Sequence, residues 1–499
     1  MKLKTAKTLV VSIPRLEPHR PPVGPAIIAN CIKQAGFPVD AVDLNIKFFR
    51  YLNDNKMYYA FDQAFDGIRS LTLSEYKNII RFLSMHYKPT VVNVDFVAIS
   101  VFGPGSRLFS HILCRYTRKH FSTVKIILGG TGVSGINDDK KHFGQHMLEQ
   151  QLCDFYIMGD GEKSIVKLLE GNITYPGINN DKYEQLIELD SLPWPDYSFY
   201  NLDEYDYLED NKEVFVVASR GCVRHCTYCT IQRYWPKFKF RSGDNIANEL
   251  ISHYEKHGIR NFYFADSLIN GSQTAFYDMC KILARYNQQH DAGFNWNAQF
   301  IFKRKHQISN EYFDIMAEAG AKRLYVGIET GSDKIRWEMD KKFTNDDITY
   351  HLENFNRTGM SVFFLMLTGY LTETLEDHQE TLDMFSRWQY YVATGTIAGI
   401  DIGTTLIIQQ GAPVATMINS HRIDFLPVLH NNEFKRANSK IMWTSELNPS
   451  LTILERMRRR IEVHNQAIKY NWPILSGEDQ LLYIKQILLE YQKVNKKLT

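Results

Sequence analysis

Three of the chain's seven cysteines lie close together in the stretch SRGCVRHCTYCT. Cys222, Cys226 and Cys229 have the spacing C-x3-C-x2-C, and no fourth cysteine follows nearby. Three thiolates on one short loop can each bind one iron of a [4Fe–4S] cube, which leaves the fourth iron without a protein ligand. An open iron can chelate a small molecule, so the spacing predicts a reactive cluster rather than a structural one.

A zinc site is the alternative for the same three cysteines. Structural zinc is tetrahedral and requires a fourth protein ligand. His225 is available, but it directly precedes Cys226, and reaching the same ion from that position is awkward. The chain contains no second C-x2-C pair that could complete the site. The pattern therefore favours an iron–sulfur cluster over zinc.

Composition and length give a coarser picture of the chain. The 499 residues are too many for one ordinary core and suggest two to four domains. A net charge of +2 favours neither nucleic acid nor a membrane surface as partner, and no apolar run approaches the ~20 residues of a membrane helix. The four remaining cysteines are scattered, which predicts a reducing, cytoplasmic setting rather than a disulfide framework.

Residues 1–170 alternate between apolar strands and helical stretches. This alternation predicts a doubly wound parallel sheet, in which ligands bind beyond the carboxyl ends of the strands. Glycine-rich turns follow three of these strands, at 103–106, 129–135 and 159–162. We expect a binding edge there. Residues 171–212 are acidic and rich in turns, and we interpret them as a linker that packs its aromatic side chains on one or both neighbouring domains.

A second series of strands and helices spans residues 213–415 and predicts a partial (β/α)6 barrel. In barrels, the chemistry gathers at the carboxyl ends of the strands. The cysteine triplet lies there, as do Asp266, Gln299 and Glu329. The pattern is lost after residue 415, and residues 416–499 read as a charged helical region.

The triplet resembles the cluster loop of the radical S-adenosylmethionine (radical SAM) superfamily. The order of later segments is similar to that superfamily too: GIETGS followed by MDKKFT, then LTGYLTETLEDHQETLDMF, then IIQQGAPV. Segments of the first domain, such as IILGGTGVS and DFYIMGDGE, resemble the cobalamin-binding domain that precedes the barrel in one large subfamily. The first domain lacks the D-x-H-x-x-G motif, so a bound cobalamin would have no histidine on its lower face.

The resemblance implies that the amino and carboxylate groups of SAM chelate the open iron, and that reductive cleavage of SAM yields a 5′-deoxyadenosyl radical. The implied reaction is cobalamin-dependent methylation of an unactivated carbon. The implied contacts with SAM are Tyr228, Asp266, Gln299 and Glu329. The implied contacts with cobalamin are Phe102, Gly103, Ser106, Gly129, Gly130 and Ser134. Neither the sequence nor the resemblance assigns a further catalytic residue.

Three alternatives remain open from the sequence. The chain could be a cobalamin-independent radical SAM oxidoreductase, cyclase or mutase. It could be a methylthiotransferase, a class that usually carries three cysteines in its first domain. It could also be a regulator that binds a metal or cobalamin without catalysis. The expected partners are an external electron donor and an unknown substrate, either a small molecule or a biosynthetic intermediate.

Overall fold

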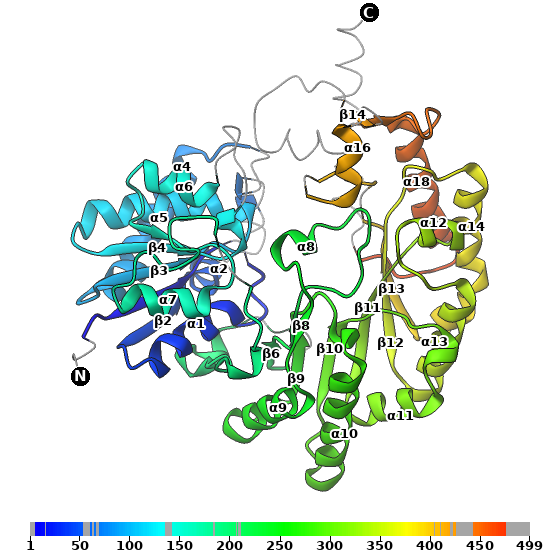
Figure 1. The fold of residues 1–499 in the computed structure, drawn as a ribbon, viewed down its shortest axis with the longest axis horizontal. Helices are drawn as coiled ribbons and strands as arrows, with labels where there is room; N and C mark the ends of the chain where they lie inside the picture. Colours follow the sequence, from blue (N-terminus) through cyan, green and yellow to red (C-terminus); the bar gives the residue numbers. More distant parts are fainter. Residues whose placement is uncertain are drawn as a thin grey trace, which may run out of the picture. The chain divides into compact units, whose positions relative to one another are not determined.

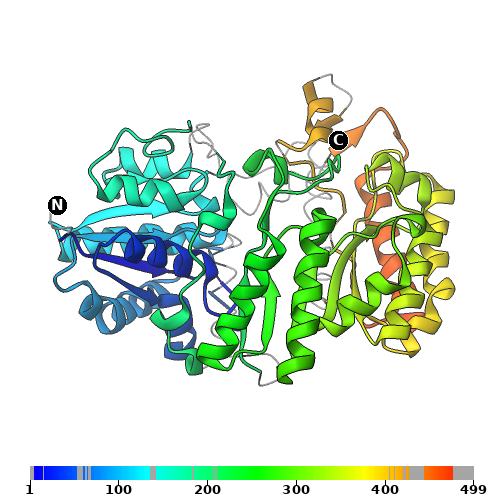
Figure 2. The same cartoon turned by 60° about the horizontal axis from the view of Figure 1, so that its bottom comes forward.

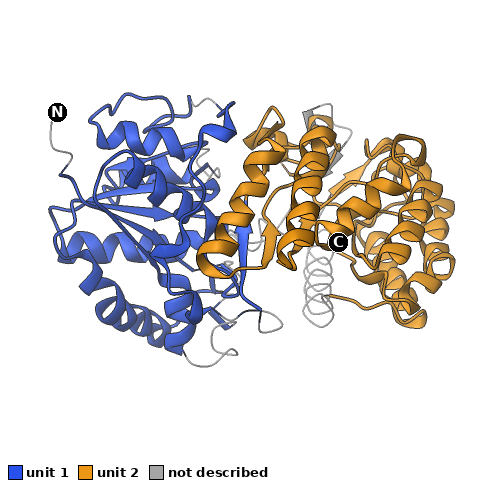
Figure 3. Cartoon of the chain, turned by 90° about the horizontal axis from the view of Figure 1, so that it is seen from below, with its two compact units in different colours: residues 1–216 blue, residues 217–499 orange. Residues whose placement is uncertain are grey.

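A computed structural model describes residues 5–475, with gaps at 15, 53–59, 62–63, 66–68, 135–141, 183–184, 206, 208–210, 404, 410, 420–422 and 426–442. The chain divides into two compact units, Met1–Val216 and Val217–Thr499 (Figure 3). Within the described ranges, no helix is both long and apolar enough to cross a lipid bilayer.

The first unit is built on a five-stranded sheet in the order β2-β1-β3-β4-β5, with every neighbouring pair parallel. The strands are β1 (Thr8–Ser12), β2 (Val39–Asp43), β3 (Phe96–Ser100), β4 (Lys125–Gly129) and β5 (Phe155–Tyr156). The strand order reverses between β1 and β3, and such a reversal in an open parallel sheet opens a crevice at the carboxyl edge. The expected binding edge is therefore present in the topology.

Helices cover both faces of this sheet (Figure 1). They are α1 (Val23–Gln34), α2 (Leu44–Leu52), α4 (Leu73–Phe82), α5 (Arg107–His120), α6 (Phe143–Glu149) and α7 (Gly161–Leu169). Helices α1 and α7 share an aliphatic core with Val10 of β1. A second, aromatic group of core side chains includes Phe48, which packs edge-on against Phe82 and Phe109 at ring-centroid distances of 5.0 and 5.8 Å. Buried side chains on both faces explain why the strands read as continuous apolar runs.

The acidic segment 171–212 lies within the first unit. Tyr197, Tyr200 and Tyr205 are buried, and the Tyr197 hydroxyl donates to the Phe215 carbonyl oxygen at 2.6 Å. The Tyr205 hydroxyl donates to Asp43, where β2 ends, at 3.0 Å. The segment thus packs its aromatic side chains on the sheet domain. The boundary between the compact units falls later than the predicted domain boundary, after Val216.

The second compact unit contains most of a six-stranded sheet in the order β13-β12-β11-β10-β9-β6. The strands are β6 (Glu213–Val216), β9 (Asn261–Phe264), β10 (Asn295–Gln299), β11 (Ala321–Glu329), β12 (Ser361–Met366) and β13 (Ile397–Asp401). Strands β9 to β13 pair in parallel, and the sheet has two open edges among the described residues. The expected partial barrel is confirmed as an open α/β sheet.

Helices connect these strands and pack on one another outside the sheet (Figures 1 and 2). They are α8 (Ile231–Tyr234), α9 (Gly243–His257), α10 (Gln273–His290), α11 (Asn310–Glu318), α12 (Asp333–Glu338), α13 (Asn345–Thr358), α14 (Leu375–Arg387) and α15 (Gln389–Ala393). Capping boxes start two of them. Thr344 and Asp347 cap α13, and Thr374 and Asp377 cap α14, each pair satisfying backbone amides that the helix leaves free.

The predicted helical region 416–499 is only partly helical. Helices α16 (Thr416–Asn419) and α18 (Ile453–Lys469) fit the expectation, but β14 (Ile423–Phe425) and β15 (Trp443–Ser445) form an antiparallel pair. In β15 the side chains alternate between buried and exposed, as in a strand with one covered face. Residues 426–442 and 476–499 of this region lie outside the described residues.

Candidate active site

The cysteine triplet lies on a loop between β7 (Ser219–Arg220) and α8. Strand β7 pairs antiparallel with β8 (Lys239–Phe240), so the loop is closed at its base. Gly221 directly precedes Cys222 with φ +86, and a Cβ atom there would lie 3.0 Å from the Lys237 carbonyl oxygen. The turn into the triplet therefore requires glycine.

All three cysteines are free thiols of intermediate burial. The Cys222 sulfur accepts a hydrogen bond from the Arg224 backbone amide at 3.4 Å, and the Cys229 sulfur accepts one from the Ile231 amide at 3.5 Å. Hydrogen bonds to cysteine sulfurs help to set the properties of iron–sulfur clusters. Three free thiols on one loop, two of them already receiving amide hydrogen bonds, fit the donor set of a [4Fe–4S] cluster.

The ionisation of these thiols depends on nearby positive charge. Burial raises the pKa of Cys226 to about 11 and also raises the pKa of Cys222, while Lys341 opposes the shift at both. Metal binding requires thiolates and releases their protons. Among the described residues, no three His, Cys, Asp or Glu side chains are placed to hold a single metal ion.

A cavity of about 450 Å³ opens onto the cysteine loop. Cys226, Cys229, Arg224 and Arg233 are among the residues that line it. Pro413, in the segment that follows β13, lines it as well. The Val414 amide donates to the Thr227 carbonyl oxygen at 2.8 Å, which ties this segment to the loop. The cavity can hold a polar ligand next to the cysteines.

A buried ion pair lies beside the triplet. The Lys341 ammonium is 2.6 Å from Glu329 Oε1, and the Tyr228 hydroxyl donates to the same oxygen at 2.7 Å. Burial opposes the charge of Lys341, but the Glu329 carboxylate and the Cys226 thiol raise its pKa overall. Burial, followed by the charge of Glu329, raises the pKa of Tyr228 well above its ordinary value. Lys341 is therefore charged at neutral pH, and the tyrosine is a neutral donor.

The backbone around Glu329 is shaped for this contact. Glu329 ends β11 with φ +64, in the left-handed region that non-glycine residues rarely adopt, and the register with β12 shifts at this point. Such strain persists where the surrounding structure enforces it, and it is common at functional sites. A Cβ atom on Gly327 would overlap the Glu329 carboxylate and lie 2.8 Å from Lys341 Nζ. Gly327 therefore leaves the space that the ion pair occupies.

The Gly327→Ala variant should displace the Glu329–Lys341 pair. We expect a loss of about 1–3 kcal/mol in the free energy of unfolding, the usual cost of overpacking a filled site. Chemical denaturation of the cofactor-free protein measures it. Gly24→Ala is the matched control, because a Cβ atom there meets nothing within 4 Å and alanine favours the helix that contains it. Equal stability of Gly327→Ala and wild type would contradict this interpretation.

The other two predicted SAM contacts lie at neighbouring strand ends. Asp266 follows β9 and is buried, and its carboxylate accepts hydrogen bonds from the backbone amides of Ala218 and Ser219. Burial raises the pKa of Asp266 to about 6, so it is ionised at neutral pH. It fixes the strand that leads into the cysteine loop. Gln299 ends β10 and is half-buried.

Lys341 was not among the residues singled out in the sequence, although it lies within the MDKKFT segment. Its side chain reaches the triplet because the turn after α12 brings residues 339–342 against the loop. The Met339 carbonyl oxygen accepts from the Thr227 amide at 3.3 Å, and Asp340 Oδ2 accepts from the His225 amide at 3.3 Å. In the sequence, Lys341 could be noticed only as one of two adjacent lysines, and adjacent lysines usually lie on a solvated surface.

In the first unit, hydrogen bonds join the two glycine-rich turns predicted to meet cobalamin. The Gly132 amide donates to the Val101 carbonyl oxygen at 2.8 Å, and Thr131 Oγ1 donates to that of Phe102. Gly130 has φ +96, and a Cβ atom there would lie 2.6 Å from the Val101 oxygen. The two turns thus form one surface at the carboxyl edge of β3 and β4.

The six predicted cobalamin contacts differ in exposure on this surface. Phe102 is 63% exposed, although it is a large apolar side chain. Ser106 is buried, and its amide donates to the Gly103 carbonyl oxygen at 3.1 Å. Ser134 Oγ donates to the Thr131 carbonyl oxygen at 2.8 Å. An exposed phenylalanine above backbone turns offers an apolar contact for a flat ligand.

Comparison with known sequences shows which family part of the chain resembles. A sequence profile of the radical SAM superfamily matches residues 216–385. Cytidylyl-2-hydroxyethylphosphonate methyltransferase of Streptomyces wedmorensis is 28% identical over 243 residues, which are 45% of this chain and 44% of that protein. The chain thus spans slightly less than half of the length of this relative.

Two solved structures share the fold over most of the chain. The radical SAM methyltransferase TsrM from Kitasatospora setae, with cobalamin and a [4Fe–4S] cluster bound, gives a TM-score of 0.60 at 14% identity and covers 91% of this chain and 81% of TsrM. The cobalamin-dependent radical SAM enzyme OxsB, with aqua-cobalamin and SAM bound, also gives 0.60, at 15% identity, and covers 84% of this chain and 61% of OxsB.

Residues 216–385 are therefore a radical SAM domain. The chain combines that domain with a preceding parallel-sheet unit in the fold seen in TsrM and OxsB.

Proposed function

We propose that this protein binds a [4Fe–4S] cluster on Cys222, Cys226 and Cys229, cleaves SAM, and uses cobalamin to methylate an unactivated carbon of a small molecule. The observation that carries the proposal is the placement of three free thiols beside the buried Glu329–Lys341 pair and Tyr228. When bound, the cluster supplies the electron that cleaves SAM to a 5′-deoxyadenosyl radical.

The chain's own residues bind and orient the cofactors in this proposal. Glu329 accepts hydrogen bonds and is the candidate partner for the SAM amino group. Tyr228 precedes the last cysteine and packs on a buried apolar cluster, which suits an aromatic contact with adenine. Asp266 fixes the strand before the loop through two backbone amides, and Gln299 is the remaining strand-end candidate. Lys341 adds positive charge that favours the thiolates.

The cobalamin part of the proposal rests on the fold and on the joined turns of the first unit. TsrM and OxsB are both described with cobalamin bound. The candidate contacts are Phe102, Gly103, Ser106, Gly129, Gly130 and Ser134. The methylthiotransferase alternative receives no support from the cysteines of this unit, because Cys31, Cys114 and Cys153 are each buried, and burial raises the pKa of the last two.

The substrate and the electron donor are proposed by class only. TsrM has been solved with tryptophan as substrate, and we propose a small molecule here as well. Two arginines, Arg224 and Arg233, line the cavity, and this residue type suits a substrate or cofactor that carries a carboxylate or phosphoryl group. The electron comes from an external reductant.

Product analysis distinguishes the proposed function from its alternatives. The protein is reconstituted anaerobically with iron, sulfide and hydroxocobalamin, desalted, and incubated with SAM and a chemical reductant. We expect retained corrin and both 5′-deoxyadenosine and S-adenosylhomocysteine as products. Deoxyadenosine without retained corrin would favour the cobalamin-independent alternatives. If neither product formed, the proposal that the protein is an enzyme that cleaves SAM would be contradicted.

A further inference from the structure

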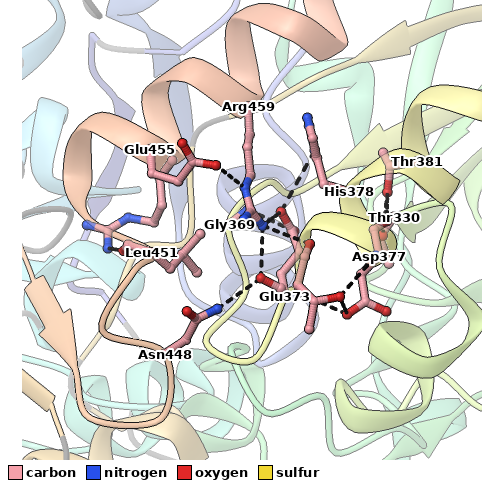
Figure 4. Close-up of polar contacts among 12 residues, drawn as sticks. Thr330, Gly369, Glu373, Asp377, His378, Thr381, Asn448, Leu451, Glu455 and Arg459 are labelled. Carbon is pink, nitrogen blue, oxygen red and sulfur yellow. Dashed lines mark hydrogen bonds and ion pairs between the residues drawn. The ribbon is translucent and has the colours of Figure 1, made fainter.

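A buried acid–base pair connects the C-terminal helix α18 with the loop after β12 (Figure 4). Arg459 on α18 and Glu373 in the loop have side chains only 2% and 3% exposed, and Arg459 Nη1 is 2.9 Å from Glu373 Oε1. The same nitrogen donates to the Glu373 carbonyl oxygen at 2.8 Å. Both charges are removed from water, so Glu373 depends on Arg459, while Arg459 also pairs with Glu455 through Nε at 2.8 Å.

The pair fixes the conformation of the loop 367–374. The second carboxylate oxygen of Glu373 accepts from the Gly369 amide at 3.1 Å, and the Glu373 amide donates to the Tyr370 carbonyl oxygen at 2.9 Å. Asn448 donates its side-chain amide to the Glu373 carbonyl oxygen at 3.0 Å. Gly369 has φ +71, and a Cβ atom there would lie 2.7 Å from Arg456 Cγ. The loop and α18 are therefore fitted closely to each other.

The loop in turn reaches the cysteine triplet through one side chain. The Tyr370 hydroxyl is 2.9 Å from Thr227 Oγ1, and Thr227 lies directly after Cys226. Tyr370 is buried in the apolar cluster that also contacts Tyr228. A continuous series of contacts thus runs from Arg459 through Glu373 and Tyr370 to Thr227.

We propose that Glu373 and Arg459 are positioning residues, which hold Tyr370 against Thr227 and thereby fix the cysteine loop for cluster and SAM binding. This rests on the proposed function only in assigning the cysteine loop to the cluster. Helix α18 lies outside the segment that matches the radical SAM profile. In this proposal it nevertheless helps to position the cysteine loop.

Thiol alkylation of the cluster-free, reduced protein tests this proposal without any cofactor. Tyr370→Phe removes the contact with Thr227 and keeps the packed ring, and Glu373→Gln weakens the pair. We expect iodoacetamide to modify Cys226 and Cys229 about fivefold faster in Tyr370→Phe than in wild type, because the segment that opens locally has lost one hydrogen bond. Modification should be faster still in Glu373→Gln. Buried Cys280 serves as the internal reference.

Thr349→Val is the matched control for general loss of stability. It removes the partner of the buried Trp388 indole N–H, which donates to Thr349 Oγ1 at 3.0 Å between α13 and the end of α14. We expect its thiols to react at the wild-type rate. Wild-type alkylation rates in Tyr370→Phe would overturn the proposal even if Glu373→Gln does not fold.

A second readout uses the reconstituted protein. Tyr370→Phe should retain the cluster and bind SAM about fivefold more weakly than wild type, by the same hydrogen-bond estimate. Unchanged SAM affinity in that variant would also contradict the proposal. If wild type took up no cluster while the alkylation differences persisted, the proposed function would fail and the positioning role would stand.

Discussion

Cys226→Ala should lose the ability to retain an iron–sulfur cluster. The variant leaves two of the three thiol ligands, and two cysteines of the loop cannot hold three irons of a cube. We expect iron and acid-labile sulfide to fall from about four per chain in reconstituted wild type to near background after desalting. SAM cleavage should fall to background with them.

Cys280→Ala is the matched control for this variant. Cys280 lies in α10, is fully buried, and its pKa is raised by burial. It should therefore lose some stability through the small cavity but keep the cluster of the wild type. Full retention of iron by Cys226→Ala would show that the triplet is not the cluster site.

Lys341→Met should produce the largest loss of stability near the site. Lys341 and Glu329 have side chains only 11% and 9% exposed, so the substitution leaves a buried carboxylate without its cation. Breaking a buried pair from one side costs about 3–5 kcal/mol. Denaturant titration of the cofactor-free protein measures the free energy of unfolding. The double variant Glu329→Gln/Lys341→Met should recover much of this loss, because no unpaired charge remains, and should still bind SAM poorly.

The adjacent lysine provides the control for Lys341. Lys342 pairs with Asp340 at 2.6 Å, but its side chain is 47% exposed, and such surface pairs contribute about 0–1 kcal/mol. Lys342→Met should therefore change stability little. Equal losses in the free energy of unfolding for the two lysine variants would mean that the buried Glu329–Lys341 pair contributes no more to stability than the exposed pair.

The sequence predicts well those features that depend on local patterns. Apolar runs that alternate with helical stretches predict both parallel sheets, and strand β11 ends at Glu329, as the GIETGS segment indicates. The spacing of the three cysteines alone makes them the candidate cluster ligands. Parallel strands that end together place their last side chains at one edge, so the candidate residues were found without any coordinates.

Features that depend on distant segments were not predictable in this way. Nothing near Lys341 in the sequence indicates that it pairs with Glu329, because the contact depends on the turn after α12 folding back onto the cysteine loop. The pair of Glu373 with Arg459 joins residues that are 86 positions apart. The strand β15 was read as helix, because the covered face that favours a strand comes from burial of Trp443, whose indole N–H donates to the Leu406 carbonyl oxygen.

The family resemblance of the motifs predicted more of the architecture than any single sequence pattern did. From the glycines and the strand order, the resemblance predicted a parallel-sheet domain before the barrel. The similarity of the fold to TsrM and OxsB over most of the chain confirms that architecture. Substrate identity did not follow from it, because the residues that line the cavity come from several loops at once.

Electron paramagnetic resonance of the reduced, reconstituted protein tests the central claim most directly. If the triplet holds three irons and leaves one open, the cluster signal should change shape and position when SAM is added, because SAM binds that iron. The change should be absent with adenosine at the same concentration, because adenosine has neither the amino nor the carboxylate group that chelates the iron. A signal that SAM leaves unchanged, at concentrations that saturate binding, would contradict an open iron beside Glu329 and Tyr228.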